Sequence, residues 1–149
     1  MRIRHVIATG SLALVSASCS LGEPEDAGSI NLFVSVNDAT LGFGETMTIT
    51  VTAKNVGVDP VSMTGPSDCL LFVEVLNNQG QVVWHTNGTC VGATVIEELG
   101  SGEEISLSFT WQGENLAGAR LSAGFYHIRP VARLSTAPYA GPPLSVALE

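Results

Sequence analysis

The feature that most constrains this chain is an alternation of apolar and polar residues that begins at Ile30 and recurs almost to the C-terminus. In residues 46–54, Met47, Ile49 and Val51 alternate with threonines. Successive side chains of a β-strand point to opposite faces, so this pattern buries one face and hydrates the other. No segment has a 3.6-residue apolar stripe longer than two turns. The pattern therefore predicts an all-β protein with little or no helix.

Seven segments have this strand pattern: residues 30–36, 46–54, 70–76, 81–85, 105–111, 125–133 and 144–148. The third and fourth are joined by Asn77-Asn78-Gln79-Gly80, and Asn and Gly adopt the positive φ angles that hairpins need. Short strands separated by turn residues predict an immunoglobulin-like antiparallel β-sandwich of about seven strands. The chain has 149 residues, and we expect a single domain over residues 30–149.

The first eighteen residues have the layout of a secretory signal. Arg2 and Arg4 precede an apolar run over residues 6–15, and Ser16-Ala17-Ser18 supplies small side chains before Cys19. An apolar run of about ten residues is half of the ~20 that cross a bilayer as a helix. We therefore predict a cleavable signal peptide over residues 1–18 and export of the mature protein.

Cys19 directly follows the small residues, an arrangement similar to the bacterial lipoprotein signal, in which the Cys is acylated and becomes the new amino terminus. We therefore predict lipidation at Cys19 and anchoring to a membrane of the bacterial cell envelope. Residues 19–29 are polar and acidic with Gly and Pro, which predicts a flexible tether. The alternative is ordinary cleavage after Ser18, which would release a soluble secreted protein.

Cysteine parity supports lipidation and predicts a disulfide. Of the three cysteines, lipidation of Cys19 would leave Cys69 and Cys90 as an even pair in an oxidising compartment. A bridge between them closes a loop worth ~3 kcal/mol in the loop-entropy model. Neither Cys has partners at metal-ligand spacing. We predict a Cys69–Cys90 disulfide.

Charge and composition exclude several functions. Fourteen acidic and six basic residues give a net charge of −8. A chain without a basic patch does not neutralise phosphates, so nucleic acid is a poor partner. The sequence contains no GxSxG, HExxH, Walker A or GxGxxG motif. The doublets Glu97-Glu98 and Glu103-Glu104 lie in or beside a turn, which is typical of hydrated surface rather than of paired catalytic carboxylates.

The histidines give a weak signal for chemistry. His127 alternates onto a polar strand face with Arg129 and Arg133, which favours a solvated side chain. A ligand site made by His85, His127 and Asp68 is the alternative, although no spacing requires it. We therefore predict that the protein is not an enzyme and has no catalytic residue, cofactor or metal.

Aromatic residues are predicted to build the core. Trp84 and Trp111 occupy apolar-facing strand positions, which favours core packing over an aromatic binding platform. Tyr126 follows Gly124 at the head of a late strand, as in the tyrosine corner of immunoglobulin-like sandwiches. A simple buried aromatic is the alternative, and both interpretations make Tyr126 structural. Asn87-Gly88-Thr89 fits the glycosylation sequon, but in a bacterial-type lipoprotein it is better interpreted as a turn.

Several segments together resemble BsuPI-type intracellular proteinase inhibitor domains, over about residues 32–131. They are Asn55 after the Thr-rich strand, Asp59-Pro60-Val61, the hairpin ending in Gly80-Gln81-Val82-Val83-Trp84, the turn 99–103 before residues 105–111, and Leu121-Ser122-Ala123-Gly124-Phe125-Tyr126. The resemblance implies a single immunoglobulin-like sandwich and, for the founding member, inhibition of serine proteases. It identifies no inhibitory residue in this chain.

The sequence thus predicts an exported module that binds a protein, with a protease as the leading partner and a loop as the contact. The candidate loops are residues 55–68, 86–92 and 112–123, and the disulfide would stiffen the second. The alternative is a non-inhibitory envelope module that scaffolds or recognises another surface component.

Overall fold

The structure, a computed structural model, describes residues 29–149. The predicted signal peptide, lipidated Cys19 and nearly all of the tether lie outside the described residues. Strands account for the regular structure, together with one turn of 3-10 helix, η2 (Asn87–Thr89). The strands are β1 (Ile30–Val36), β2 (Thr40–Leu41), β3 (Met47–Asn55), β4 (Val61–Pro66), β5 (Leu71–Leu76), β6 (Val82–His85), β7 (Thr94–Leu99), β8 (Glu104–Trp111), β9 (Gly124–Arg133), β10 (Pro138–Ala140) and β11 (Leu144–Leu148).

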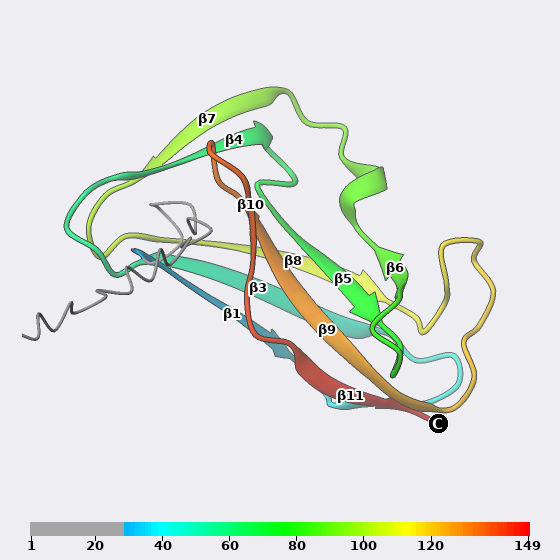
Figure 1. Cartoon of the computed structure of the whole chain (residues 1–149). Helices are drawn as coiled ribbons and strands as arrows, with labels where there is room; N and C mark the ends of the chain where they lie inside the picture. Colours follow the sequence, from blue (N-terminus) through cyan, green and yellow to red (C-terminus); the bar gives the residue numbers. More distant parts are fainter. Residues whose placement is uncertain (1–28) are drawn as a thin grey trace, which may run out of the picture.

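The described chain is an immunoglobulin-like antiparallel β-sandwich, which confirms the predicted fold class (Figure 1). One sheet has the order β1-β3-β8, and the other has the order β2-β11-β9-β5-β6 with β10 beside β9. All of these pairs are antiparallel except β2 with β11. Each predicted segment forms a strand, and β2, β4, β7 and β10 are additional to the prediction.

The core lies between the two sheets and is built by the alternation that the sequence displays. In β3, Met47, Ile49, Val51 and Ala53 are buried while the intervening threonines are not. Val73 and Ile128 of the second sheet are fully buried in the same core cluster. Burial of such side chains stabilises the fold by about 1.5–3 kcal/mol each.

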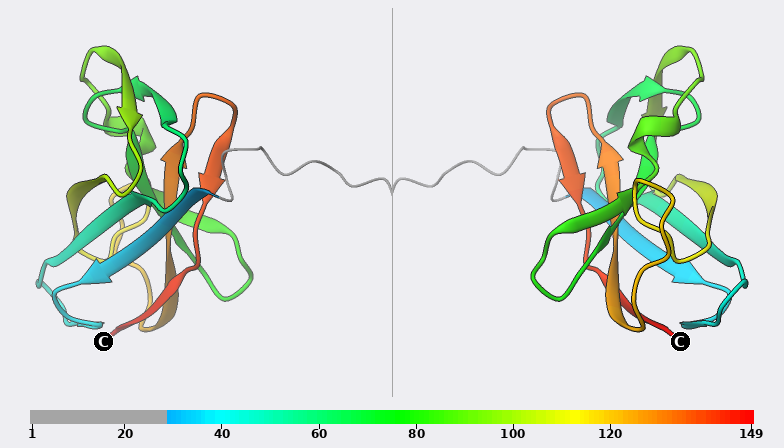
Figure 2. Two further views of the ribbon diagram at one scale, coloured as in Figure 1. Left: turned by 90° about the vertical axis from the view of Figure 1, so that its left-hand side faces the viewer. Right: turned by 90° about the vertical axis from the view of Figure 1, so that its right-hand side faces the viewer.

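A third, two-stranded sheet of β4 and β7 lies at the end of the sandwich opposite the C-terminus (Figures 1 and 2). It continues the β3–β8 ladder, because β4 follows β3 along the chain and β7 precedes β8. Figure 1 shows this ribbon of two strands bending sharply between the two ladders. The bend brings β7 and the loop before it to the surface of the molecule.

Asn55 holds the bend together from inside. Its side chain is fully buried and donates to the carbonyls of Asp59 and Leu99 at 2.7 and 2.9 Å, while its oxygen accepts from Gly57 N at 2.9 Å. Its backbone N–H also donates to the carbonyl of Glu103. A buried amide with all of these partners is satisfied where the ladder is interrupted.

Candidate functional site

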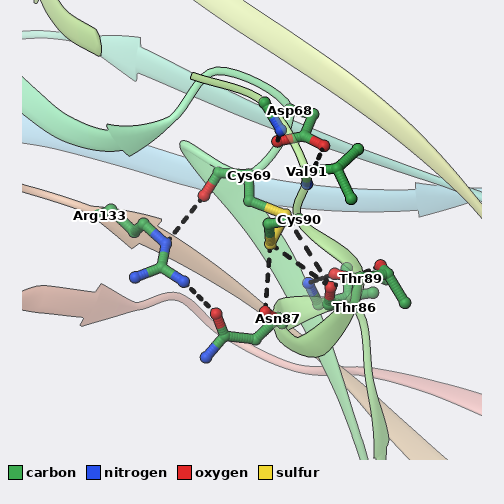
Figure 3. The surroundings of a disulfide bond; sticks show 10 residues. Asp68, Cys69, Thr86, Asn87, Thr89, Cys90, Val91 and Arg133 are labelled. Atoms are coloured by element: carbon green, nitrogen blue, oxygen red, sulfur yellow. Dashed lines mark hydrogen bonds between the residues drawn. A yellow bond between two sulfur atoms is a disulfide. The ribbon is translucent and has the colours of Figure 1, made fainter. Parts of the chain in front are cut away.

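The predicted disulfide is present and joins Cys69 to Cys90, with Cα atoms 5.8 Å apart (Figure 3). Cys69 is buried just before β5, whereas Cys90 lies in the loop between β6 and β7. The bridge therefore ties the 86–92 loop, one of the three candidate contact loops, to the buried segment that leads into β5.

Hydrogen bonds fix the first half of this loop. Thr86 is buried, its N–H donates to Val73 O at 3.1 Å, and its hydroxyl accepts from Val73 N at 3.2 Å. The hydroxyl of Thr89 donates to Thr86 O at 2.9 Å across η2. The sequon residues 87–89 thus form a turn, as the sequence predicted.

The carboxylate of Asp68 fixes the second half of the 86–92 loop. Its two carboxylate oxygens accept from Val91 N at 2.8 Å and from Gly92 N at 3.0 Å (Figure 3). The hydrogen bond from Val91 N, followed by that from Gly92 N, holds the pKa of this carboxyl below its ordinary value, although desolvation opposes them. A Cβ on Gly92 would lie 2.5 Å from Ser67 Oγ and 2.6 Å from Asp68 Oδ1, so a larger residue at this position would displace these two side chains.

Arg133 on β9 braces the same loop from the side. Its Nε donates to Cys69 O at 3.0 Å, and its guanidinium also donates to Asn87 Oδ1 (Figure 3). The guanidinium lies 5.1 Å from the centre of the Phe72 ring. The cation thus links strands β5 and β9 to the loop through both hydrogen bonds and a cation–π contact.

These contacts present one apolar side chain to solvent. Val91 is 92% exposed although its backbone is held by the disulfide at Cys90 and by Asp68. A side chain on a fixed backbone loses little conformational freedom when a partner binds it. We call residues 86–92, with the Cys69–Cys90 bridge and Asp68, the clamped loop.

The other two candidate loops are shaped differently. About half of 55–68 forms strand β4, and the rest is organised around Asn55, with Val58 exposed at the surface. In 112–123, Asn115 Oδ1 accepts from Ala117 N and Ala119 N, and Leu116 N donates to Val83 O. Val56 is 57% exposed and Leu116 is 59% exposed, so the 55–68 loop presents two aliphatic side chains, Val56 and Val58, and the 112–123 loop presents one.

The histidines do not assemble the alternative ligand site. His127 Nδ1 lies 3.0 Å from Ser145 Oγ on the outer face of the second sheet, and His85 pairs with Glu74 across β5 and β6. Asp68 is engaged in the clamped loop. Within the described part of the chain, no three His, Cys, Asp or Glu side chains gather so that they could hold a metal ion.

The aromatic residues lie where the sequence predicted them. Trp111 is fully buried, and its Nε1 donates to Glu114 O at 2.9 Å. Trp84 is half-buried with its ring centroid 6.1 Å from that of Trp111. Tyr126 packs edge-on against Trp111, and its hydroxyl donates to Ser122 O at 3.0 Å. This bond to a backbone carbonyl four residues upstream is the geometry of a tyrosine corner.

Sequence reasoning did not identify the two residues that define the clamped loop. The sequence suggests Asp68 only as a metal ligand, and no hydropathy pattern distinguishes Val91. The usable signal is local, because an Asp precedes one bridged Cys and a Val-Gly pair follows the other. A short carboxylate beside one end of a disulfide can reach backbone N–H groups beside the other end.

Comparison with known proteins extends no further than the fold. No protein-family model and no curated protein matches the sequence. The DNA glycosylase AlkC of Pseudomonas fluorescens, bound to DNA with an abasic site analogue, is 11% identical with a TM-score of 0.51 over 81% of this chain and 30% of that one. A β-glucosidase from Listeria innocua is 17% identical with a TM-score of 0.44 over 80% of this chain and 16% of that one.

A third similar structure, the CARDB domain of the PF1109 protein from Pyrococcus furiosus with di-metal ions, is 18% identical with a TM-score of 0.47. The match covers 80% of this chain and 87% of the CARDB domain chain. The present chain therefore spans a small part of the length of the two enzymes, and the similarity to AlkC is one of fold alone. In residues 29–149, no helix is long and apolar enough to span a membrane.

Proposed function

We propose that this protein is an exported, lipid-anchored module that binds another protein through the clamped loop, and that its leading partner is a proteinase that it inhibits. The observation that carries the proposal is the 92% exposure of Val91 on a backbone held by a disulfide and a carboxylate. Binding residues are often found on loops that a rigid scaffold positions, and a backbone that is already fixed lowers the entropy cost of binding. The similarity to BsuPI-type domains supports the choice of a proteinase.

A second candidate, a non-inhibitory envelope recognition module, is favoured by one detail of the same loop. The N–H groups of Val91 and Gly92 both donate to Asp68. They are therefore not free to pair with a protease as a substrate backbone would. A partner that receives only the Val91 side chain in an apolar pocket needs no such pairing.

An inhibition assay distinguishes the proteinase inhibitor from the non-inhibitory recognition module. The purified protein with its disulfide formed is titrated against serine, cysteine and metalloproteases, and a gel verifies that it survives intact. Inhibition is expected to be saturable and to be lost in Val91→Asp. Val58→Asp is the matched control, because Val58 is 86% exposed on a different loop. A folded protein that leaves every protease active overturns the inhibitor proposal.

If no protease responds, a photoreactive residue at position 91 tests the second candidate. Crosslinking in cells should then capture a partner without protease activity, and the same residue at position 58 should not. Anchoring is tested by detergent phase partitioning of the native protein and of Cys19→Ala. Equal partitioning of both into the aqueous phase contradicts lipidation.

A further inference from the structure

Strand β7 has a free edge. It pairs only with β4, and the described chain places no strand on its other side. Ser67 N donates to Ala93 O at the start of this ladder, and antiparallel hydrogen bonds recur every second residue. The backbone groups of Val95 and Glu97 therefore face β4, and those of Ile96 and Glu98 point outward. Ile96 is also 71% exposed.

The free edge borders an acidic groove. This groove, of about 500 Å³, lies where β7 turns into β8. It is lined by Glu97, Glu98, Leu99, Gly102, Glu103, Glu104 and Ile105. The four glutamates are all exposed, and Glu103 also accepts from Gly100 N at 2.7 Å. Lys54 lies opposite Glu104 in the register of β3 and β8, but the two side chains form no salt bridge. The salt bridge found in residues 29–149 joins Arg129 to Glu74.

We infer that the β7 edge is a second interaction surface, which accepts an extended, lysine- or arginine-rich segment of a partner protein as an added strand. The outward N–H and C=O groups of Ile96 and Glu98 would pair with the backbone of that segment. Ile96 offers it an apolar contact, and the four carboxylates, which form no ion pair within residues 29–149, attract its cations. The inference goes beyond the proposed function, because it uses neither Val91 nor protease inhibition.

Charge selects this occupant over a second copy of the chain. Two β7 strands paired edge to edge would bring Glu97 and Glu98 close to the same residues of the other copy, and like charges opposite one another are destabilising. Charges on an edge strand protect it against self-association, and the same charges leave the edge open to a basic segment. The net charge of −8 also repels a second copy of the chain and attracts a basic segment, over a longer range than the glutamates alone.

The test uses two labelled peptides, an alternating Lys-Val octapeptide and its Glu-Val counterpart, with fluorescence anisotropy at 20 and 300 mM NaCl. The Lys-Val peptide is expected to bind saturably and more weakly at high salt, and the Glu-Val peptide is expected not to bind. Glu97→Gln/Glu98→Gln should weaken binding about fivefold or more, since each exposed pair contributes up to ~1 kcal/mol. Glu45→Gln/Glu114→Gln removes the same charge elsewhere and should have little effect.

Two further measurements separate strand addition from plain charge attraction. Ile96→Pro removes an outward N–H that the β4 ladder does not use, and should abolish binding, whereas Ile96→Ala should only weaken it. Hydrogen exchange is measured on the unmodified protein, so its result does not depend on whether a variant folds. The peptide should slow exchange at Ile96 and Glu98, and leave the free edge of β8 at Ser106 and Ser108 unchanged.

Equal binding of both peptides, an equal effect of the two Gln pairs, or protection away from β7 would overturn the inference. The Val91→Asp variant keeps this test apart from the proposed function. It should lose inhibition while it retains binding of the Lys-Val peptide, so either idea can fail alone.

Discussion

The side-chain amide of Asn55 donates to the backbone carbonyl of Leu99 at 2.9 Å, inside the bend where the β3–β8 ladder gives way to the β4–β7 ladder. The two residues are 44 positions apart, and Asn55 is fully buried. Its oxygen accepts from Gly57 N, so one side chain joins both strands of the ribbon at the point where they turn. The position of β7, and of the edge it exposes, depends on this contact.

We therefore expect Asn55→Ala to destabilise the protein by about 2–4 kcal/mol. The substitution leaves the buried Leu99 O and the partly buried Gly57 N without this partner, and an unsatisfied buried group costs about 1–3 kcal/mol. The urea unfolding midpoint measures the loss. Asn78→Ala, in an exposed turn, serves as the control and should change stability by less than ~0.5 kcal/mol. Equal midpoints for the two variants would show that the bend does not need the amide.

Removal of the disulfide by Cys69→Ala/Cys90→Ala should lower the free energy of unfolding by ~3 kcal/mol, because a separation of 21 residues is no longer closed in the unfolded chain. The clamped loop should also lose its amide protection at Val91 and Gly92. Chemical denaturation followed by hydrogen exchange measures both effects. Reduction of the unmodified protein should reproduce them, and an unchanged midpoint after complete reduction would contradict the prediction.

The stabilisation that Asp68 provides through its hydrogen bonds to Val91 N and Gly92 N should depend on pH. Hydrogen bonds from Val91 and Gly92 lower the pKa of Asp68 in the folded protein below its ordinary value of 3.8. The unfolded chain therefore takes up the proton first as pH falls. The stabilisation is fully present above the ordinary value and is lost as pH drops through the folded pKa.

Unfolding midpoints of the unmodified protein and of Asp68→Asn from pH 7 to pH 2 measure this linkage. The amide keeps the shape of the side chain, but it has only one oxygen for the two N–H donors. The difference between the two proteins should be constant near neutral pH and should shrink below about pH 4. A difference that is independent of pH would show that the carboxylate charge has no part in the clamp.

Strands that bury one face of the sandwich could be predicted from the sequence, because burial imposes a period of two on their residues. Strand β3 is the clearest case. In the four strands that were not predicted, this pattern is short or interrupted; β4 buries alternate residues, but its apolar and polar residues alternate only over residues 61–64. β2 has two residues, β10 begins with Pro138, β4 contains Gly65 and Pro66, and β7 exposes Ile96 and Glu97 in succession. Their pairing depends on tertiary neighbours that no local pattern encodes.

The candidate site was less predictable than the fold for a related reason. Cysteine parity identified the Cys69–Cys90 bridge, and the resemblance pointed to loops as contacts. The presentation of Val91 depends on Asp68, 23 positions away, and on Arg133 from a third strand. Such contacts join segments that only the folded sandwich brings together, so their geometry could not be derived from spacing.

Tyr126 gives a test that separates the two sequence interpretations of this residue. A tyrosine corner uses the hydroxyl, which donates to Ser122 O at 3.0 Å, whereas a plain buried aromatic does not need it. Tyr126→Phe keeps the ring against Trp111 and leaves Ser122 O without this donor. We expect a loss of about 1 kcal/mol, measured by urea denaturation. Tyr139→Phe is the matched control, because Tyr139 is a half-buried tyrosine on the short strand β10. If both variants unfold at the midpoint of the unmodified protein, the ring alone accounts for the role of Tyr126, and the loop before β9 is held by its backbone contacts, such as Leu121 N to Gly113 O at 2.8 Å.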